Sequence, residues 1–253
     1  MTVRILAIGL VLLAAGMVRP ARAEDPDARQ LVEEALEALP RSSFKAQVKL
    51  SGDYRTDREL AVQHKFVEGA RSTYIEVISP DFLAGMRFLF REQVGRPPKQ
   101  HMRYIASKMP VLIASDTRAE PFLGSTFSLV DMVEPDLESN TYRFVGSDTV
   151  NGRKCKLVEA TPDDPANAVY SKAIHCIDPE TLVVVRRQLF DRKGKPAKEW
   201  TGAKIEKVEG NWTVLDQRMK DIPRDVETRM EIVKIDYDVD IPESVFTTEY
   251  LTR

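Results

Sequence analysis

Residues 121–132 read PFLGSTFSLVDM, an apolar stretch in a chain that otherwise alternates like a series of β-strands. Phe127, Leu129 and Met132 are more large apolar side chains than is usual in a water-exposed connection between strands. A Gly-Ser pair precedes them, and they lie between two prolines, Pro121 and Pro135. The stretch therefore predicts a short helical segment near residues 126–134 that packs against a sheet.

The flanking sequence shows the two-residue period of strands that are buried on one face. In GMRFLFR (residues 85–91), Met86, Phe88 and Phe90 share one face, and Leu89 lies on the other face with two arginines. Further strand candidates are FKAQVKLS, TYIEVI, KCKLVEAT, VYSKAIHCI, TLVVVRRQLF and NWTVLDQRMKDI. Several are separated by Asn-Gly, Lys-Gly or Gly-Asn turn signals. The pattern predicts many antiparallel strands in sequential order, with one wet face and one face that covers a second layer or a cavity.

The last strand candidate changes phase along its length. Apolar residues fall on even positions up to Ile232 and on odd positions from Val233 onward. A slip of one residue is typical of a β-bulge, which bends a strand. The sheet is therefore predicted to be curved.

The start of the chain has the features of a cleavable signal peptide. A basic start precedes the apolar run of residues 5–18, which is too short for a comfortable membrane span. A small-x-small pattern ends at Ala23, so we expect residues 1–23 to be removed on export to the periplasm. The mature chain then opens with an amphipathic helix, capped by Asp25 and stopped by Pro40.

Cleavage leaves residues 24–253 and removes three arginines, which changes the formal net charge from −2 to −5. This acidic balance argues against nucleic acid as a partner, because binding phosphates requires clustered lysines and arginines. No linker rich in Gly, Ser or Pro divides these residues, so a single domain is predicted.

Cys155 and Cys176 are the only cysteines. If their strands form a hairpin with the cysteines directly opposite each other, the same register places Glu159 opposite Lys172. An oxidising compartment permits a disulfide, which would contribute roughly 3 kcal/mol on the chain-entropy model. The alternative is two buried thiols that never meet. The sequence favours a structural disulfide.

A search for catalytic or metal-binding residues returns no candidate. The chain lacks a G-x-S-x-G elbow, a phosphate-binding glycine loop and an H-E-x-x-H motif. Its histidines, His64, His101 and His175, are far apart, so neither a metal nor a cofactor is predicted. Because neighbours on a strand point to opposite faces, we interpret His175, next to Cys176, as a surface residue.

PFLGSTFSLVDM resembles the F-x-G-S-x-F-S/T-x-x-D signature of the outer-membrane lipoprotein-sorting proteins, the LolA-like periplasmic carriers. The matching residues are Phe122, Gly124, Ser125, Phe127, Ser128 and Asp131. The downstream strands, an Asp-x-x-Gly-Lys turn at residues 191–195 and the ending DIPESVFTTEYL are also similar to that family. The chain departs from the family at residues 103–113, where basic residues often follow a Tyr-Leu-Pro stretch.

The resemblance implies a mainly β fold with helices (α+β), a curved antiparallel half-barrel in which an N-terminal helix and a helical lid enclose an apolar cavity. It also implies binding of lipid or lipoprotein acyl chains, and an inner-membrane exporter or outer-membrane acceptor as partner. The residues that would line the cavity and lid are Met86, Phe88, Phe90, Phe122, Phe127, Leu129 and Met132. Ser125 or Ser128 would cap the lid helix, and Asp131 would complete a capping box.

Two other interpretations remain open. The apolar residues could be ordinary core, since most buried apolar side chains are. The fold could also serve a periplasmic sensor or adaptor that binds a segment of a membrane protein. A lipid esterase is a third hypothesis, but no serine stands out, so no enzymatic activity is predicted.

Overall fold

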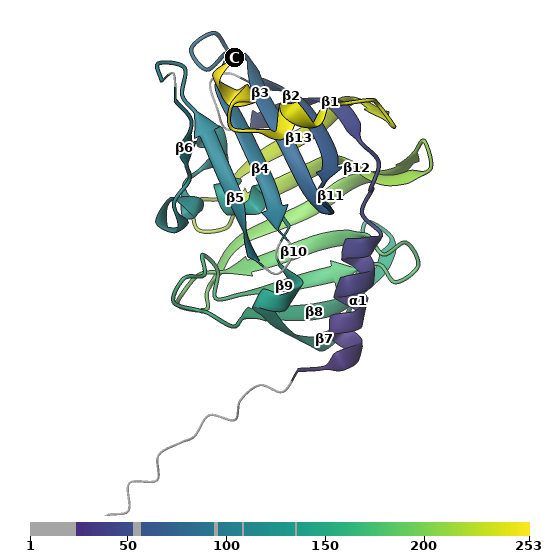
Figure 1. Ribbon diagram of the computed structural model, residues 1–253. Helices are drawn as coiled ribbons and strands as arrows, with labels where there is room; N and C mark the ends of the chain where they lie inside the picture. Colours follow the sequence, from purple (N-terminus) through teal and green to yellow (C-terminus); the bar gives the residue numbers. More distant parts are fainter. Residues whose placement is uncertain (1–23, 53–56, 94–95, 108, 135) are drawn as a thin grey trace, which may run out of the picture.

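The computed structural model describes residues 24–52, 57–93, 96–107, 109–134 and 136–253. These residues form one antiparallel sheet of 13 strands, with one α-helix and several 3₁₀ turns (Figure 1). The predicted signal peptide, residues 1–23, lies outside the described residues. The mainly β fold expected from the alternation is confirmed.

Strands β1 to β6 and strands β7 to β13 form two series of consecutive hairpins. In chain order they are α1 (Pro26–Glu37), β1 (Phe44–Gly52), β2 (Arg58–Val67), β3 (Ala70–Ser79), β4 (Arg87–Gln93), β5 (Arg96–Arg103), β6 (Val111–Leu112), β7 (Asn140–Val150), β8 (Arg153–Pro162), β9 (Lys172–Ile177), β10 (Val184–Phe190), β11 (Pro196–Val208), β12 (Asn211–Asp221) and β13 (Val226–Tyr237). The order across the sheet is β6-β5-β4-β3-β2-β1-β13-β12-β11-β10-β9-β8-β7. The first and last long strands thus meet in the middle, and β6 and β7 form the two edges.

The predicted Asn-Gly turn joins β7 to β8. Asn151 and Gly152 both have positive φ, 50° and 79°, as a two-residue type I′ hairpin requires. This turn type matches the right-handed twist of the strands that it joins. Consecutive strands can therefore pair over their whole length and form one twisted sheet.

The predicted bulge lies in the middle of the sheet, where β13 pairs with β1. Gln47 pairs with Lys234 and Val48 pairs with Ile232, so Val233 has no partner on β1. The Val233 side chain is 63% exposed. The extra residue keeps the apolar residues on both sides of it on the same face of the sheet, which bends there as expected.

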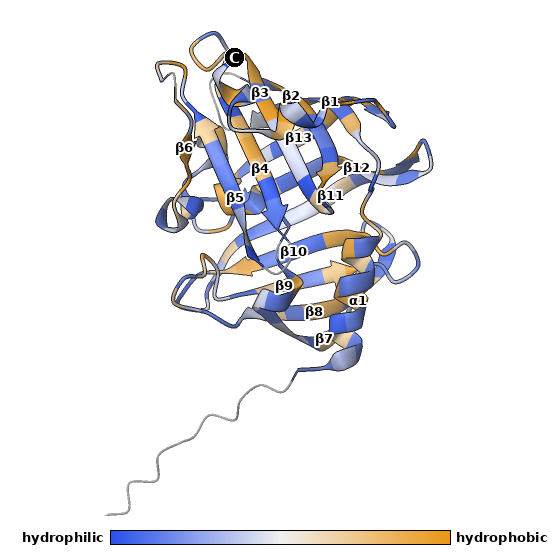
Figure 2. Cartoon of the chain, in the orientation of Figure 1, coloured by the Kyte–Doolittle hydropathy of each residue, from blue (hydrophilic) through white to orange (hydrophobic). Residues whose placement is uncertain are grey.

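Helix α1 covers the end of the sheet formed by β7, β8 and β9 (Figure 1). The Asp25 carboxylate caps it by accepting from the Asp27 and Ala28 N–H groups (3.1 and 3.4 Å). Its buried stripe consists of Ala28, Leu31, Val32 and Ala35 and packs on Tyr142 and Val158, among others. The helix therefore sits where its amphipathic pattern predicts, and its acidic face remains in solvent (Figure 2).

The inner, concave face of the sheet carries the main core. Register places Ala160, Ala173 and Leu189 on this face, because each pairs directly with the next across β8, β9 and β10. Ala160 packs with α1, whereas Leu189 belongs to the main core, so α1 and this core lie on the same side of the sheet. On the opposite side, 3₁₀ turns η5 (Glu243–Phe246) and η6 (Tyr250–Thr252) belong to a separate cluster with residues of β2, β3 and β4.

Cys155 and Cys176 form the predicted disulfide, with a Cα–Cα distance of 5.3 Å. The predicted register is wrong by two residues, because Cys176 lies opposite Leu157 and the disulfide crosses the ladder diagonally. Glu159 likewise pairs diagonally with Lys172 (2.8 Å). A shift of two residues keeps every side chain on its original face, so both contacts form despite the shift.

Candidate functional site

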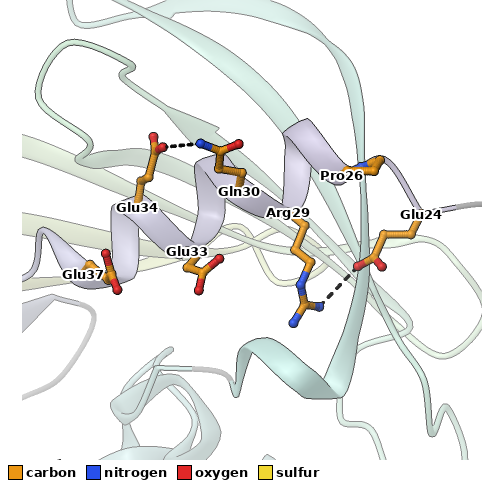
Figure 3. A pocket seen from close by; sticks show the side chains of 7 residues that line it. All are labelled: Glu24, Pro26, Arg29, Gln30, Glu33, Glu34 and Glu37. Carbon is orange, nitrogen blue, oxygen red and sulfur yellow. Dashed lines mark hydrogen bonds and ion pairs between the residues drawn. The ribbon is translucent and has the colours of Figure 1, made fainter.

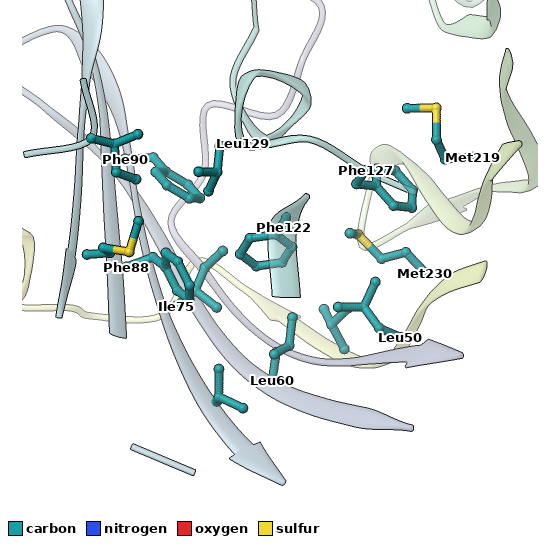
Figure 4. Packing of buried hydrophobic residues seen from close by; sticks show 14 of the residues in the cluster. Leu50, Leu60, Ile75, Phe88, Phe90, Phe122, Phe127, Leu129, Met219 and Met230 are labelled. Atoms are coloured by element: carbon teal, nitrogen blue, oxygen red, sulfur yellow. The ribbon is translucent and has the colours of Figure 1, made fainter. Parts of the chain in front are cut away.

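Residues 121–134, which we call the interior segment, pack inside the curve of the sheet (Figure 4). Two short 3₁₀ turns, η2 (Phe122–Gly124) and η3 (Leu129–Met132), replace the helix predicted near residues 126–134. The segment reverses direction because Leu123 and Gly124 have positive φ, 52° and 76°. A hydrogen bond from the Phe122 N–H to the Phe127 carbonyl (2.8 Å) closes this loop.

The aromatic side chains singled out in the sequence pack against one another. Phe122 is fully buried, and the centre of its ring lies 5.0 Å from that of Phe88 and 6.4 Å from that of Phe90 (Figure 4). Phe127 and Leu129 are buried in the same cluster, and Met86 and Met132 pack at its border. These residues fill the part of the half-barrel formed by β1 to β5, so the space predicted as a cavity contains the protein's own side chains.

Polar contacts fix the interior segment to the opposite part of the sheet. The Lys198 ammonium on β11 donates to Ser128 Oγ (2.6 Å) and pairs with Asp131 (3.3 Å). The Tyr170 hydroxyl donates to the same carboxylate (2.9 Å), and the Thr126 hydroxyl donates to the Met219 carbonyl (2.6 Å). Lys198, Tyr170 and Thr126 were not among the predicted site residues.

Asp131 also has the capping role expected from the motif. The Ser128 N–H donates to Asp131 Oδ2 (2.7 Å), and the two residues form a capping box around η3. Gly124 supplies the turn, and Ser125 Oγ accepts from the Phe127 N–H (3.2 Å). Burial and the Asp131 charge raise the pKa of Tyr170, so its hydroxyl remains a proton donor to the carboxylate.

A pocket of about 410 Å³ lies between the interior segment and the inner face of β8 to β12. The segment contributes Val130, Asp131, Val133 and Glu134 to its wall. Its sheet side is lined by Ala160, Ala173, His175, Arg187, Leu189, Trp200, Gln217 and Met219. Of the residues predicted for the cavity, lid and lid motif, Asp131 alone borders this pocket.

His175 lies in the wall of this pocket and is 8% exposed, so its interpretation as a surface residue is wrong. The predicted parity is correct, but the face opposite Cys176 is the concave interior instead of solvent. Burial, followed by the charge of Arg187, lowers the pKa of the imidazole from 6.5 to about 3. The ring is therefore neutral at neutral pH.

Arg187 lies directly across from His175 in the β9–β10 ladder. Its Nη2 donates to Glu134 Oε2 (2.6 Å), and its guanidinium carbon lies 5.4 Å from the centre of the Trp200 ring. The Trp200 indole is held in turn by a hydrogen bond to Gln217 Oε1 (2.8 Å). A second polar group of the pocket, Gln100 on β5, is 1% exposed and donates to the Leu129 carbonyl (2.7 Å).

Comparison with known proteins assigns the chain to a family. Residues 69–253 match a family model whose description reads "-like: Uncharacterized protein", and this range contains both the interior segment and the pocket. The chain belongs to this family and has the LolA-like fold. No curated protein matches the sequence.

Three solved structures support the LolA-like fold. A putative outer membrane lipoprotein-sorting protein domain from Vibrio parahaemolyticus superposes with a TM-score of 0.84 at 19% identity, covering 90% of this chain and 99% of that one. A DUF1329 family protein from Desulfovibrio piger has a TM-score of 0.82 at 20% identity, with coverages of 89% and 98%. A LolA superfamily protein from Nitrosomonas europaea has a TM-score of 0.68 at 13% identity, with coverages of 88% and 98%.

Within this LolA-like chain, Ser128 and Lys198 are the pair closest in form to a catalytic dyad. A nucleophilic serine needs a neighbouring base that can take its proton. Ser128 Oγ instead donates to the Ala119 carbonyl (3.1 Å) and accepts from an ammonium that also pairs with Asp131. The pair is thus arranged to hold the interior segment in place.

Other surfaces of the LolA-like chain are weaker candidates for a binding site. The exposed face of α1 forms a shallow hollow, where Arg29 pairs with Glu24 and Gln30 donates to Glu34 (Figure 3). Two more glutamates and a proline complete its lining, as expected for a solvated acidic helix face. Among the described residues, no group of three potential metal ligands occurs, and no helix is long and apolar enough to cross a membrane.

Proposed function

We propose that this protein is a periplasmic carrier that binds the acyl chains of a lipid or lipoprotein and hands them over during transport to the outer membrane. The observation that carries the proposal is the interior segment. The apolar side chains of the segment pack against those of the sheet inside the half-barrel, and the segment borders a pocket of about 410 Å³.

Moving an acyl chain through water requires an apolar shell. Each exposed methylene costs about 0.8 kcal/mol, so a carrier must cover most of the chain. The pocket falls within the range of small-molecule sites, roughly 300–1,000 Å³, and Val133, Ala173, Leu189 and Met219 give it apolar walls. A longer chain would extend into the space that Phe122, Phe127 and Leu129 now fill.

The interior segment would act as the lid. Its apolar side chains leave the aromatic cluster when the acyl chain enters, and the acyl chain then replaces their contacts with β1 to β5. The polar contacts of Asp131 and Thr126 hold the closed state. In this proposal Met86, Phe88 and Phe90 contact the bound chain from the sheet, and Met132 moves with the lid.

The remaining parts of the proposal rest on the sequence and the disulfide. Residues 1–23 would direct export and be removed after Ala23, and residues 24–253 would act as one domain. The Cys155–Cys176 disulfide fits an oxidising compartment. An inner-membrane exporter or an outer-membrane acceptor would load or unload the carrier. Binding and handover need no covalent step, so the proposal includes no enzymatic activity.

The experiment that tests the proposal is native mass spectrometry of the mature protein purified from periplasm, followed by organic extraction of bound molecules. We expect a lipid or lipoprotein fragment at close to one molecule per protein. Protein that is reproducibly empty, and that also takes up no acyl-chain probe, would contradict the carrier and favour the sensor or adaptor that binds a protein.

A variant that fills the pocket sharpens this test. Ala173→Trp on β9 should reduce bound lipid, because the new ring would occupy the pocket from its sheet wall. Ile174→Phe is the matched control, since the next residue on the strand points to the opposite face. Equal lipid content in both variants would place the bound molecule elsewhere.

A further inference from the structure

Arg187 has an incomplete set of partners for a guanidinium whose side chain is only 21% exposed. Its Nη2 donates to Glu134, but its Nε is buried and has no hydrogen-bond partner. An arginine side chain presents Nε and Nη2 along one edge, and that edge matches the two oxygens of a carboxylate or phosphate. Glu134 satisfies half of this edge. Leaving the other buried donor unsatisfied costs free energy, so a better-placed anion would stabilise the site.

The surroundings of Arg187 are suited to an anion that carries an apolar chain. Trp200 lies under the guanidinium and Leu189 follows two residues later on the same face of β10, so the cation adjoins apolar surface. His175, directly across the ladder, is 8% exposed, and its ring has no hydrogen-bond partner among the described residues. A neutral imidazole can donate one hydrogen bond to an anionic oxygen without adding charge.

The acidic groups of the pocket have other partners. Asp131 is paired with Lys198 and Tyr170. Asp136 accepts from the Glu138 N–H (3.3 Å) within its own turn, and Asp164 accepts from Asn167 (2.7 Å). Glu134 is therefore the carboxylate that occupies Arg187, and it belongs to the interior segment.

We infer that the pocket binds the anionic head group, a carboxylate or a phosphate, of an acyl-chain amphiphile, and that this head group displaces Glu134 from Arg187. The inference rests on the proposed carrier function and assigns its ligand class. Arg187 is the binding residue, His175 supplies a neutral donor, and Trp200 forms the floor. Displacement releases Glu134 together with the end of the interior segment, so binding of the head group opens the way for the chain.

The test compares three amphiphiles with the same twelve-carbon chain: dodecanoate, dodecyl phosphate and dodecanol. Mature protein is stripped of lipid and titrated below the micelle concentration of each probe. Trp212→Phe leaves Trp200 as the only tryptophan, so its fluorescence reports on the pocket itself. We expect at least one anion to bind about ten-fold or more tightly than the alcohol, as is typical of a hydrogen-bonded charge. Preference for the carboxylate indicates a fatty acid, and preference for the phosphate indicates a phosphoester lipid.

Two substitutions with opposite expected effects test whether the preference for an anion over the alcohol arises at Arg187. Arg187→Gln should bring the affinities for anion and alcohol to within about two-fold, because the amide has no charge. Glu134→Gln should raise the affinity for the anion several-fold, because it removes the competing carboxylate. Arg186→Gln is the matched control, since this neighbour points to the other face and pairs with Asp148 (2.7 Å).

The outcomes separate the inference from the proposed function. Equal binding of anions and alcohol, or a preference that survives Arg187→Gln, overturns the inference and leaves the carrier intact. No binding of any of the three probes overturns both. If Arg187→Gln does not fold, Glu134→Gln decides, because an unchanged affinity for the anion would show that Glu134 does not compete for Arg187.

Discussion

The two halves of the half-barrel share one sheet and one alternation pattern, yet their interiors differ. The half formed by β1 to β5 is filled by its own apolar side chains together with those of the interior segment, with Phe122 fully buried among β-strand residues. The half formed by β8 to β12 contains the pocket, which is lined by apolar, aromatic and charged side chains. A sheet can therefore supply a core in one part and a binding site in another. The difference depends on what the interior segment places against each part.

The largest effect should come from removing an aromatic ring from the filled half. Phe122→Ala deletes a ring between Phe88 and Phe90, and we expect a loss of about 3–5 kcal/mol in the free energy of unfolding. Leu189→Ala, in the wall of the pocket, should cost less, about 2 kcal/mol, because its side chain already borders empty space. Chemical denaturation of both variants measures the difference. Equal losses would contradict the distinction between a filled and a hollow half.

Removing the disulfide should lower the free energy of unfolding almost as much. The disulfide lies behind the hollow half. Cys155 and Cys176 pack with Val150 and Val185 on the side of the sheet away from the pocket. Replacing both by serine should cost roughly 3 kcal/mol, from the loss of a cross-link between residues 21 apart in sequence. Denaturation of the wild type with and without reductant provides the control. A variant as stable as the oxidised wild type would show that this half needs no covalent support.

The contact between the two halves should have a smaller effect. Asp131→Asn leaves Lys198 without its carboxylate partner and weakens the capping box, and we expect a loss of about 2 kcal/mol. The loss should be local, so hydrogen exchange of residues 121–134 should speed up more than that of β1 or β13. Asp136→Asn, in the next turn, is the control. Uniform acceleration over the whole sheet would indicate general unfolding instead of release of the segment.

The smallest effect should be the acid sensitivity of the hollow half. Burial lowers the pKa of His175 to about 3, so the folded state favours the neutral ring. Its stabilising contribution is complete above pH 6.5 and declines as the pH falls toward 3, by an amount on the order of 1–2 kcal/mol at pH 5. Burial also lowers the pKa of His64 to about 4, so the stabilising contribution of this residue declines over a similar pH range.

His175→Gln isolates the share of the acid sensitivity that belongs to the pocket. The free energy of unfolding, followed from pH 7 to pH 4, should fall less steeply in this variant than in the wild type. His64→Gln tests the contribution of the other half in the same way. An unchanged slope in His175→Gln would mean that the imidazole becomes protonated without cost, and hence that the pocket admits water freely.

Much of the fold could be predicted from the sequence, because alternation reports which residues share a face. The Asn151–Gly152 turn, the bulge at Val233, the extent of α1 and eight strands, β1, β3, β4, β8 to β10, β12 and β13, follow from local chemistry. Strands β2, β5, β6, β7 and β11 were not among the candidates. The register of the cysteine hairpin could not be predicted exactly. A disulfide and an ion pair can form diagonally as well as directly across a ladder, so the sequence allows both registers.

The site was harder to predict, because alternation does not show what covers each face. His175 has the expected parity, but the second face of its strand turned out to be an interior wall. The aromatic residues were expected around a cavity and instead pack together. One signal was available for the pocket. Arg186 and Arg187 are adjacent on a strand, so one of them has to point inward.

The bulge in β13 separates the importance of chain length from that of residue identity. Val233 contacts no partner on β1, and its side chain is mostly in solvent, so many residues could replace it. Its presence nevertheless sets the phase of everything that follows, because removing one residue would turn Ile235 and Tyr237 to the opposite face. At this position relatives of the protein should vary freely in residue type but tolerate neither an insertion nor a deletion.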